Sequence, residues 1–201
     1  MPHTLMRPIT VSANGVRLEP LSLTHESGLA AAAADGQLWN LRVANVPAPE
    51  DTRAWIEKAL AQQDAGQRLP LAVVQEGSGR VIGTTSFYEP DPEVRRLAVG
   101  YTWYAQSAQR THVNTTCKLL LLSQAFDVLG CAIVVWHTDN FNFASQRAIE
   151  RLGAKKDGVL RHHKRRRDGT VRDTVTYSMT AAEWPECRAQ LLDLLKQHRP
   201  A

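Results

Sequence analysis

The most constraining feature of this chain is a change of hydrophobic period near its middle. Residues 97–104 predict a β-strand, whereas residues 115–129 carry large apolar side chains at helical spacing and end at Gly130. Residues 132–138 then form a nearly continuous apolar run, which predicts a strand buried on both faces. This order predicts a local α/β unit whose broadly apolar helix is almost surrounded by protein.

The remaining patterns predict a sheet flanked by helices. Before the central unit they indicate an edge strand, two helices and two strands joined by a glycine-containing turn, at residues 16–21, 24–35, 49–65, 71–75 and 81–88. After it they indicate a helix, two strands around an Asp-Gly turn and a C-terminal helix, at residues 142–152, 159–164, 171–178 and 180–199. That last helix either begins or is kinked at Pro185.

We therefore expect an α/β fold, in the α+β sense of a mixed and mostly antiparallel sheet of about seven strands. All 201 residues are expected to form one domain, with a core at 16–178 and an added C-terminal helix in 179–201.

Composition limits the class of protein without indicating a chemistry. The chain is 43% hydrophobic and 22% charged, with a formal net charge of +4, which is ordinary for a globular protein. No apolar run reaches the roughly 18 residues of a membrane span, and residues 1–16 do not resemble a signal peptide, so we expect a cytoplasmic protein. The three cysteines, Cys117, Cys131 and Cys187, are widely spaced, which favours neither a disulfide framework nor a metal site.

The junction before the long helix is the first candidate for chemistry. A strand ends at residues 103–105, and residues 109–115 lead directly into the helix. Such a junction directs free backbone N–H groups and the positive end of the helix dipole at one place, which suits an anion. The alternative is a polar loop with a simple threonine or asparagine cap, because most such junctions bind nothing.

The order of elements resembles the GNAT superfamily of acetyl-CoA-dependent N-acetyltransferases, and within it the RimJ/RimL-type branch. The resemblance is carried by residues 99–104, 109–115 and 142–154, with shorter matches at 161–162 and 168–173. It implies a twisted mixed sheet and direct transfer of an acetyl group from acetyl-CoA to a primary amine. The implied acceptor is a small molecule or a protein N-terminus, and no metal is implied.

The resemblance also implies a cofactor site. The family loop has the pattern Gln/Arg-x-x-Gly-x-Gly/Ala, whose backbone amides hold the CoA pyrophosphate. Gln109 matches the first position, whereas His112 and Asn114 replace the small residues and put the affinity in question. Arg110 and His112 could compensate by adding charge or hydrogen bonds, so we expect binding to be retained. The expected cofactor-binding residues are Trp103, Tyr104, Gln109, Arg110, Thr111, His112, Val113, Asn114, Thr115, Asn142 and Ser145.

Acetyl transfer needs a polarised thioester carbonyl, a neutral amine and stabilisation of the departing thiolate. By the resemblance, a backbone N–H of residues 103–105 meets the carbonyl, Asn142 contacts the pantetheine arm, and Ser145 assists the thiolate. Tyr101 and Tyr104 are alternative acids, although a tyrosine in a strand is first a packing residue. Asn142 and Ser145 are equally suited to helix capping. The candidates for the general base, unless a water molecule carries the proton, are Glu89, Asp91, Glu93 and His137.

A basic run supports a competing interpretation. Residues 161–167 carry five formal positive charges on one arm of a hairpin, where alternate side chains face opposite ways. A non-catalytic domain of the same fold that binds CoA weakly, and RNA or protein through this hairpin, is therefore the alternative to the enzyme. A solvated hairpin is the simpler explanation of the charges, which makes a nucleic-acid partner the less favoured one. A homodimer through the hairpin or the C-terminal helix stays open.

Overall fold

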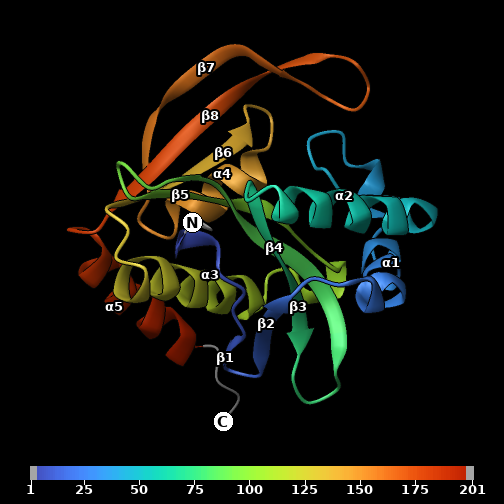
Figure 1. Cartoon of the computed structure of the whole chain (residues 1–201), viewed down its shortest axis with the longest axis horizontal. Coiled ribbons are helices and arrows are strands. Elements are labelled where there is room, and N and C mark those ends of the chain that lie inside the picture. The colour runs from blue at the N-terminus through green and yellow to red at the C-terminus, as the bar shows by residue number, and fades with distance from the viewer. Residues whose placement is uncertain (1–3, 198–201) are drawn as a thin grey trace.

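A computed structural model describes residues 4–197, which are built around an eight-stranded sheet (Figure 1). The strands are β1 Val11–Ala13, β2 Val16–Pro20, β3 Arg68–Gln75, β4 Arg80–Asp91, β5 Arg96–Tyr104, β6 Ile133–Asp139, β7 Lys155–Arg165 and β8 Val171–Thr180. Their spatial order is β1-β2-β3-β4-β5-β6-β8-β7, and every neighbouring pair is antiparallel except β5 with β6. The mixed, mostly antiparallel α/β fold expected from the sequence is confirmed.

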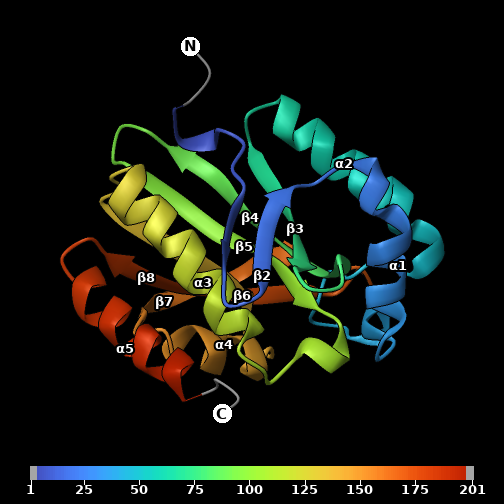
Figure 2. The ribbon, with the colours of Figure 1, turned by 90° about the horizontal axis from the view of Figure 1, so that it is seen from below.

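Five α-helices of the described chain flank this sheet. They are α1 Glu26–Ala34, α2 Thr52–Asp64, α3 Val113–Ser123, α4 Phe143–Glu150 and α5 Trp184–Lys196. Helices α1 and α2 pack against β4 and β3, whereas α3 and α5 lie side by side across the other face of the sheet (Figure 2). No helix within residues 4–197 has the length and apolar character needed to cross a membrane.

Several elements differ in extent from the sequence-based expectation. β3, β4 and β7 are longer than expected, because pairing with their neighbours continues past the apolar pattern, and the short β1 was not expected at all. The long helix is α3 followed by a π-helical turn, η6 Gln124–Val128. Helix α5 begins at Trp184 with Pro185 in its first turn, so it is not kinked there. The expected helical residues 198–199 lie outside the described residues.

Burial confirms one central expectation and corrects the other. Most side chains of α3 are buried, as its broad apolar face predicts. β6, however, is fully buried on one face only: Val134, Trp136 and Thr138 are buried, while on the other face Ile133, Val135 and His137 are half-buried and only the last residue, Asp139, is buried. The expectation of a strand covered on both faces is therefore wrong, because the half-buried side of β6 lines an open pocket.

β5 and β6 separate after a short parallel pairing. The pairing covers only Arg96–Ala98 with Ile133–Val135, although both strands continue beyond it. In the unpaired part, β5 has one extra residue opposite β4, and Tyr101 takes a φ of 51°. We call this separation of β5 from β6 the splay, and the extra residue of β5 the β5 bulge.

Close approach of β4 to β5 beside the bulge requires glycine at position 83. A Cβ atom there would lie 2.2 Å from the Trp103 carbonyl oxygen, and φ is 156°. Gly83→Ala should therefore lower the free energy of unfolding by about 3 kcal/mol in urea titrations. Gly77→Ala, in an open turn with nothing within 4 Å of the added Cβ, should change it by less than about 0.5 kcal/mol. Equal stability of the two variants would contradict this tight approach.

Candidate functional site

Unpaired backbone N–H groups gather where β5 leads into α3. The Tyr104 carbonyl at the end of β5 accepts a hydrogen bond from Gln109 Nε2 at 2.9 Å, which fixes the start of the loop. Within residues 4–197, no protein acceptor meets the N–H groups of Arg110, Thr111, His112, Asn114 and Thr115. This concentration of donors at a helix N-terminus is the arrangement that binds phosphate in other proteins.

The two residues that replace the small positions of the family loop are accommodated without strain. His112 has a φ of −65°, and its Nε2 donates to the Asn14 carbonyl in the β1–β2 turn at 3.1 Å. Asn114 lies in α3 and its Oδ1 accepts from the Tyr104 hydroxyl at 3.2 Å. The left-handed residue of the loop is Arg110, with a φ of 60°. Neither His112 nor Asn114 therefore occupies a conformation that requires glycine.

The other loop residues bind within the loop or to α4. Thr111 Oγ1 donates to the Ala108 carbonyl at 2.7 Å, while the Val113 side chain is part of the core. Thr115 Oγ1 accepts from Arg151 at 3.3 Å. Arg151 adds a second exposed cation, besides Arg110, at the start of α3, and no sequence pattern singled it out. No motif marks it, because only the tertiary fold brings the end of α4 to Thr115.

Trp103 and Tyr104 point to opposite faces of the sheet. The Trp103 ring packs edge-on against Trp55 of α2, with centroids 6.3 Å apart. Tyr104 is buried against α3, where burial and the neighbouring Cys117 raise its pKa well above the usual value. A phenol in this environment is a poor proton donor. The catalytic role expected of Tyr104 stays a prediction, and the burial of its hydroxyl argues against that role.

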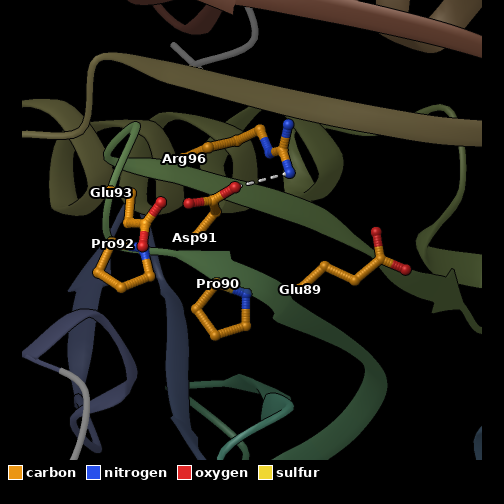
Figure 3. Close-up of a pocket in the computed structure, with 6 residues that line it drawn as sticks. All are labelled: Glu89, Pro90, Asp91, Pro92, Glu93 and Arg96. Carbon is orange, nitrogen blue, oxygen red and sulfur yellow. Dashed lines mark hydrogen bonds and ion pairs between the residues drawn. The ribbon is translucent and has the colours of Figure 1, made fainter.

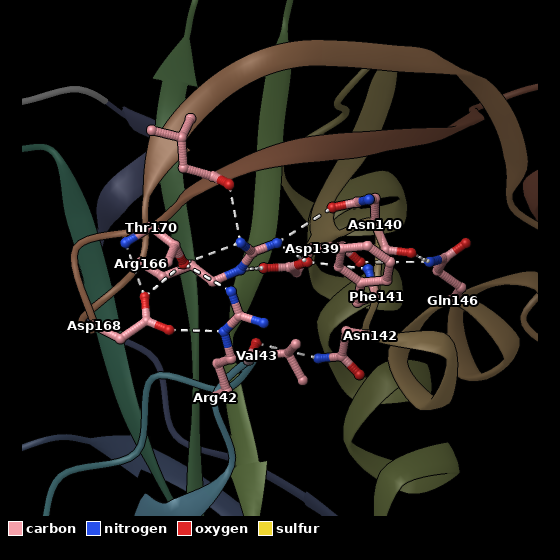
Figure 4. A network of polar contacts seen from close by, with 11 residues as sticks. Arg42, Val43, Asp139, Asn140, Phe141, Asn142, Gln146, Arg166, Asp168 and Thr170 are labelled. Atoms are coloured by element: carbon pink, nitrogen blue, oxygen red, sulfur yellow. Dashed lines mark hydrogen bonds and ion pairs between the residues drawn. The ribbon is translucent and has the colours of Figure 1, made fainter.

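Asn142 caps helix α4. Of the two roles expected of it, capping and contact with the pantetheine arm, capping is the simpler. Its Oδ1 accepts from the Ser145 N–H at 3.0 Å, and its Nδ2 donates to the Val43 carbonyl at 3.4 Å (Figure 4). The half-buried Ser145 hydroxyl has no hydrogen-bond partner within the described chain. Ser145 is thus free for the expected contact with a thiolate, and that contact stays a prediction.

The tip of the basic hairpin is bound to the body of the protein. Arg166 donates to both carboxylate oxygens of Asp139, at 2.6 and 3.0 Å, and the two side chains are only 5% and 1% exposed. Arg167 donates to the Val46 carbonyl at 2.7 Å. Arg42 pairs with Asp168 at 2.7 Å, as Figure 4 shows. These arginines join the hairpin to the end of β6 and to the α1–α2 connection, so the run is not one free basic surface.

An open pocket of about 410 Å³ lies on the half-buried side of β6. It brings together Glu89 and His137, whose Oε2 and Nδ1 atoms are 3.7 Å apart. The Tyr88 hydroxyl lies 3.0 Å from the same Nδ1. Burial lowers the pKa of His137 despite the opposing effect of Glu89, so the imidazole is neutral at pH 7.

A neighbouring shallow pocket of about 490 Å³ contains the other two base candidates (Figure 3). Asp91 pairs there with Arg96 at 3.0 Å, and Glu93 lies in the same turn. Glu89 points away from both carboxylates (Figure 3). Of the four candidates, only Glu89 and His137 are in polar contact with each other. No group of three or more His, Cys, Asp or Glu side chains within residues 4–197 could hold a metal ion.

Removal of one partner from the buried Asp139–Arg166 pair should destabilise the fold. Asp139→Ala leaves a buried guanidinium without its carboxylate, so we expect a loss of about 3 kcal/mol near pH 7. Burial raises the pKa of Asp139, but the hydrogen bonds from Arg166 and the Phe141 N–H outweigh it and leave the pKa below its usual value. The stabilisation is therefore lost as the pH falls through this lowered pKa, and the difference from wild type should shrink there.

Urea titrations at several pH values measure this effect. Asp193→Ala, which removes the carboxylate of an exposed pair with Lys196, serves as the control and should change the stability little at any pH. A loss for Asp139→Ala that is no larger than the control's would contradict the assignment.

Comparison with known proteins identifies the family. The acetyltransferase (GNAT) domain model matches residues 16–155. A protein of T. thermophilus described as an acetyltransferase is 35% identical over 94% of this chain and 98% of its own, with a TM-score of 0.82. A GCN5-related N-acetyltransferase from Brucella melitensis is 29% identical over 94% of this chain and 86% of its own, with a TM-score of 0.83.

A more distant structure shares the fold. It is that of Mycobacterium smegmatis RimJ in complex with CoA-disulfide, 17% identical over 89% of this chain and 88% of its own, with a TM-score of 0.75. No curated protein matches the sequence significantly. The family match, together with the splay and the donor-rich start of α3, shows that this chain belongs to the GNAT acetyltransferase family and is an acetyl-CoA-dependent acyltransferase.

Proposed function

We propose that the protein transfers the acetyl group of acetyl-CoA directly to a primary amine of a small molecule or a protein N-terminus. The observation that carries this proposal is the position of the splay. On one side of it lie the unpaired N–H groups at the start of α3, and on the other lies the pocket with Glu89 and His137. Because the separated strands lie between an anion site and a basic side chain, acetyl-CoA and the acceptor amine could enter from opposite faces of the sheet and meet there.

The N–H groups of residues 110–115 would bind the CoA pyrophosphate, with Arg110 and Arg151 adding charge. From there the pantetheine arm would follow the unpaired edge of β5, past Asn142 and Ser145. The CoA-disulfide complex of M. smegmatis RimJ, which has the same fold, supports a CoA site in this chain.

His137 is the base that the pocket favours. Its Nδ1 faces Tyr88 and Glu89, whereas its Nε2 has no partner within the described chain. A proton on Nδ1, assigned here from these neighbours, leaves the Nε2 lone pair to accept a proton from the acceptor amine. The Glu89 carboxylate then stabilises the imidazolium that forms.

The reaction has two steps, addition of the amine and loss of the thiolate. The amine nitrogen attacks the thioester carbonyl carbon while His137 Nε2 takes its proton; a C–N bond forms and the carbonyl oxygen becomes an oxyanion. Collapse of this intermediate restores the carbonyl and breaks the C–S bond, so the sulfur leaves as a thiolate. Free N–H groups of β5 in the splay are the donors that would meet the oxyanion.

Binding of the donor can be tested without knowing the acceptor. Isothermal titration calorimetry should detect acetyl-CoA binding to the wild type. Arg110→Glu and Arg151→Glu should each weaken it at least tenfold, about 1.4 kcal/mol, because a negative charge then faces the phosphates. Lys58→Glu on α2, with the same change in net charge, should leave it unchanged. Absence of acetyl-CoA binding by the wild type would overturn the proposal.

The base can be tested by the pH dependence of thiol release from acetyl-CoA with a panel of amines. Since the imidazole must be neutral and its pKa is lowered, wild-type kcat/KM should fall only below pH 6.5. His137→Gln should lower kcat/KM about a hundredfold or more at pH 7 and abolish this acidic limb. His163→Gln, in the same pocket, is the matched control and should retain the limb. An unchanged limb in His137→Gln would exclude His137 as the base.

A further inference from the structure

Two buried cations flank the β5 bulge, and neither has a carboxylate partner within the described chain. Lys118 of α3 is 5% exposed and Arg68 of β3 is 4% exposed. None of the ion pairs of residues 4–197 includes either side chain. Buried charges are normally paired, because removal from water costs several kcal/mol per ion. These two therefore need an explanation.

Lys118 binds the bulge itself. Its Nζ donates to Thr102 Oγ1 at 3.0 Å. Since the ammonium group can only donate, the Thr102 hydroxyl must direct its own proton elsewhere, either to Thr85 Oγ1 at 2.8 Å or to the Gly100 carbonyl at 3.3 Å. Lys118 thus restricts the orientation of the Thr102 hydroxyl and links α3 to the unpaired stretch of β5, directly after the strained Tyr101.

Arg68 holds the bulge from the other face. Its guanidinium lies 3.8 Å from the centroid of the Tyr101 ring and 5.0 Å from that of Trp55, and its Nε donates to Ser86 Oγ at 2.8 Å. Ser86 follows Thr85 in β4, and successive strand residues face opposite ways, so Arg68 and Lys118 lie on opposite sides of the sheet. Positive charge is therefore present on both faces of the bulge.

The charges are in an environment that strengthens their effect. Burial lowers the pKa of Lys118 to about 8, with the adjacent Cys117 thiol as the opposing influence, and burial lowers the pKa of Arg68 to about 10. Both groups therefore remain mainly protonated at pH 7. A fixed cation in a medium of low dielectric interacts more strongly with new negative charge than the same cation in water.

We propose that Lys118 is a positioning residue for acetyl transfer, which pins the β5 bulge through Thr102 and supplies a buried positive charge beside the splay where the CoA sulfur leaves. This inference rests on the proposed function, since it assigns the thioester to the splay. Lys118 keeps its proton throughout; the sulfur takes the electron pair of the broken C–S bond, and the amine proton goes to His137. The uncompensated cation of the free protein becomes paired when the thiolate forms.

The test measures the ionisation of bound CoA, which requires no acceptor. In CoA complexes titrated with pH, the ultraviolet absorbance of the thiolate reports the pKa of the bound thiol. We expect this pKa to lie below that of free CoA in the wild type and to rise by about one unit, a tenfold change in ionisation, in Lys118→Met. Lys118→Arg, which keeps the charge, should retain most of the wild-type shift.

Measurements of stability and turnover in Lys118→Met distinguish a role of Lys118 in catalysis from a purely structural one. Replacement of a buried unpaired charge by methionine should not lower the melting temperature, while kcat for an amine identified in the panel should fall about tenfold at unchanged KM for acetyl-CoA. Thr102→Val, which removes the hydrogen bond but keeps the ammonium group, should shift the thiol pKa less than Lys118→Met. Lys58→Met on α2 is the surface control and should match the wild type.

Each outcome discriminates. An identical thiol pKa in wild-type and Lys118→Met complexes, with CoA bound in both, would overturn the inference and leave the proposed function intact. Loss of CoA binding in Lys118→Met alone would also overturn it, because Lys118 would then act on binding rather than on the thiolate. Failure of the wild type to bind CoA would overturn the proposed function and this inference together.

Discussion

The separation of β5 from β6 after three residue pairs is the constraint on which the rest of this structure depends. Parallel strands joined by a helix would ordinarily pair along their length, but the extra residue at Tyr101 redirects β5 and leaves its backbone groups beyond Ala98 without a strand partner on that side. Such groups are costly inside a protein unless something binds them. The fold therefore presents unpaired donors in the middle of its sheet, beside the start of α3.

The hairpin of β7 and β8 shows how charge is used to hold this opening. Arg166 reaches the end of β6 and forms a buried pair with Asp139, while Arg167 binds a backbone carbonyl of the α1–α2 connection. Two segments more than a hundred residues apart in sequence are thereby joined beside the splay. Two of the five positive charges of residues 161–167, those of Arg166 and Arg167, are engaged in this contact, so less of the run is free than its composition suggests. The match to the acetyltransferase family is what disfavours the non-catalytic alternative.

The features of the site that depend only on residues close in sequence could be predicted. The N–H groups at the start of α3 and the capping of α4 by Asn142 follow from helix geometry, and both were expected. The effect of His112 on CoA affinity stays a prediction. His112 does not take a conformation reserved for glycine, because its backbone is helical and its ring binds the β1–β2 turn. No local pattern could have shown this, since that turn lies about a hundred residues earlier in the chain.

Apart from the short β1, the sequence by itself determined the order and type of the helices and strands, because hydrophobic period and turn residues act over a few neighbouring positions. Only the tertiary structure decided which polar groups meet. Glu89 reaches His137 from another strand, and Lys118, set in an apolar helix that predicts burial and nothing more, reaches the β5 bulge. The physical reason is that strand pairing and helix packing join residues distant in sequence, and such contacts leave no period in the chain.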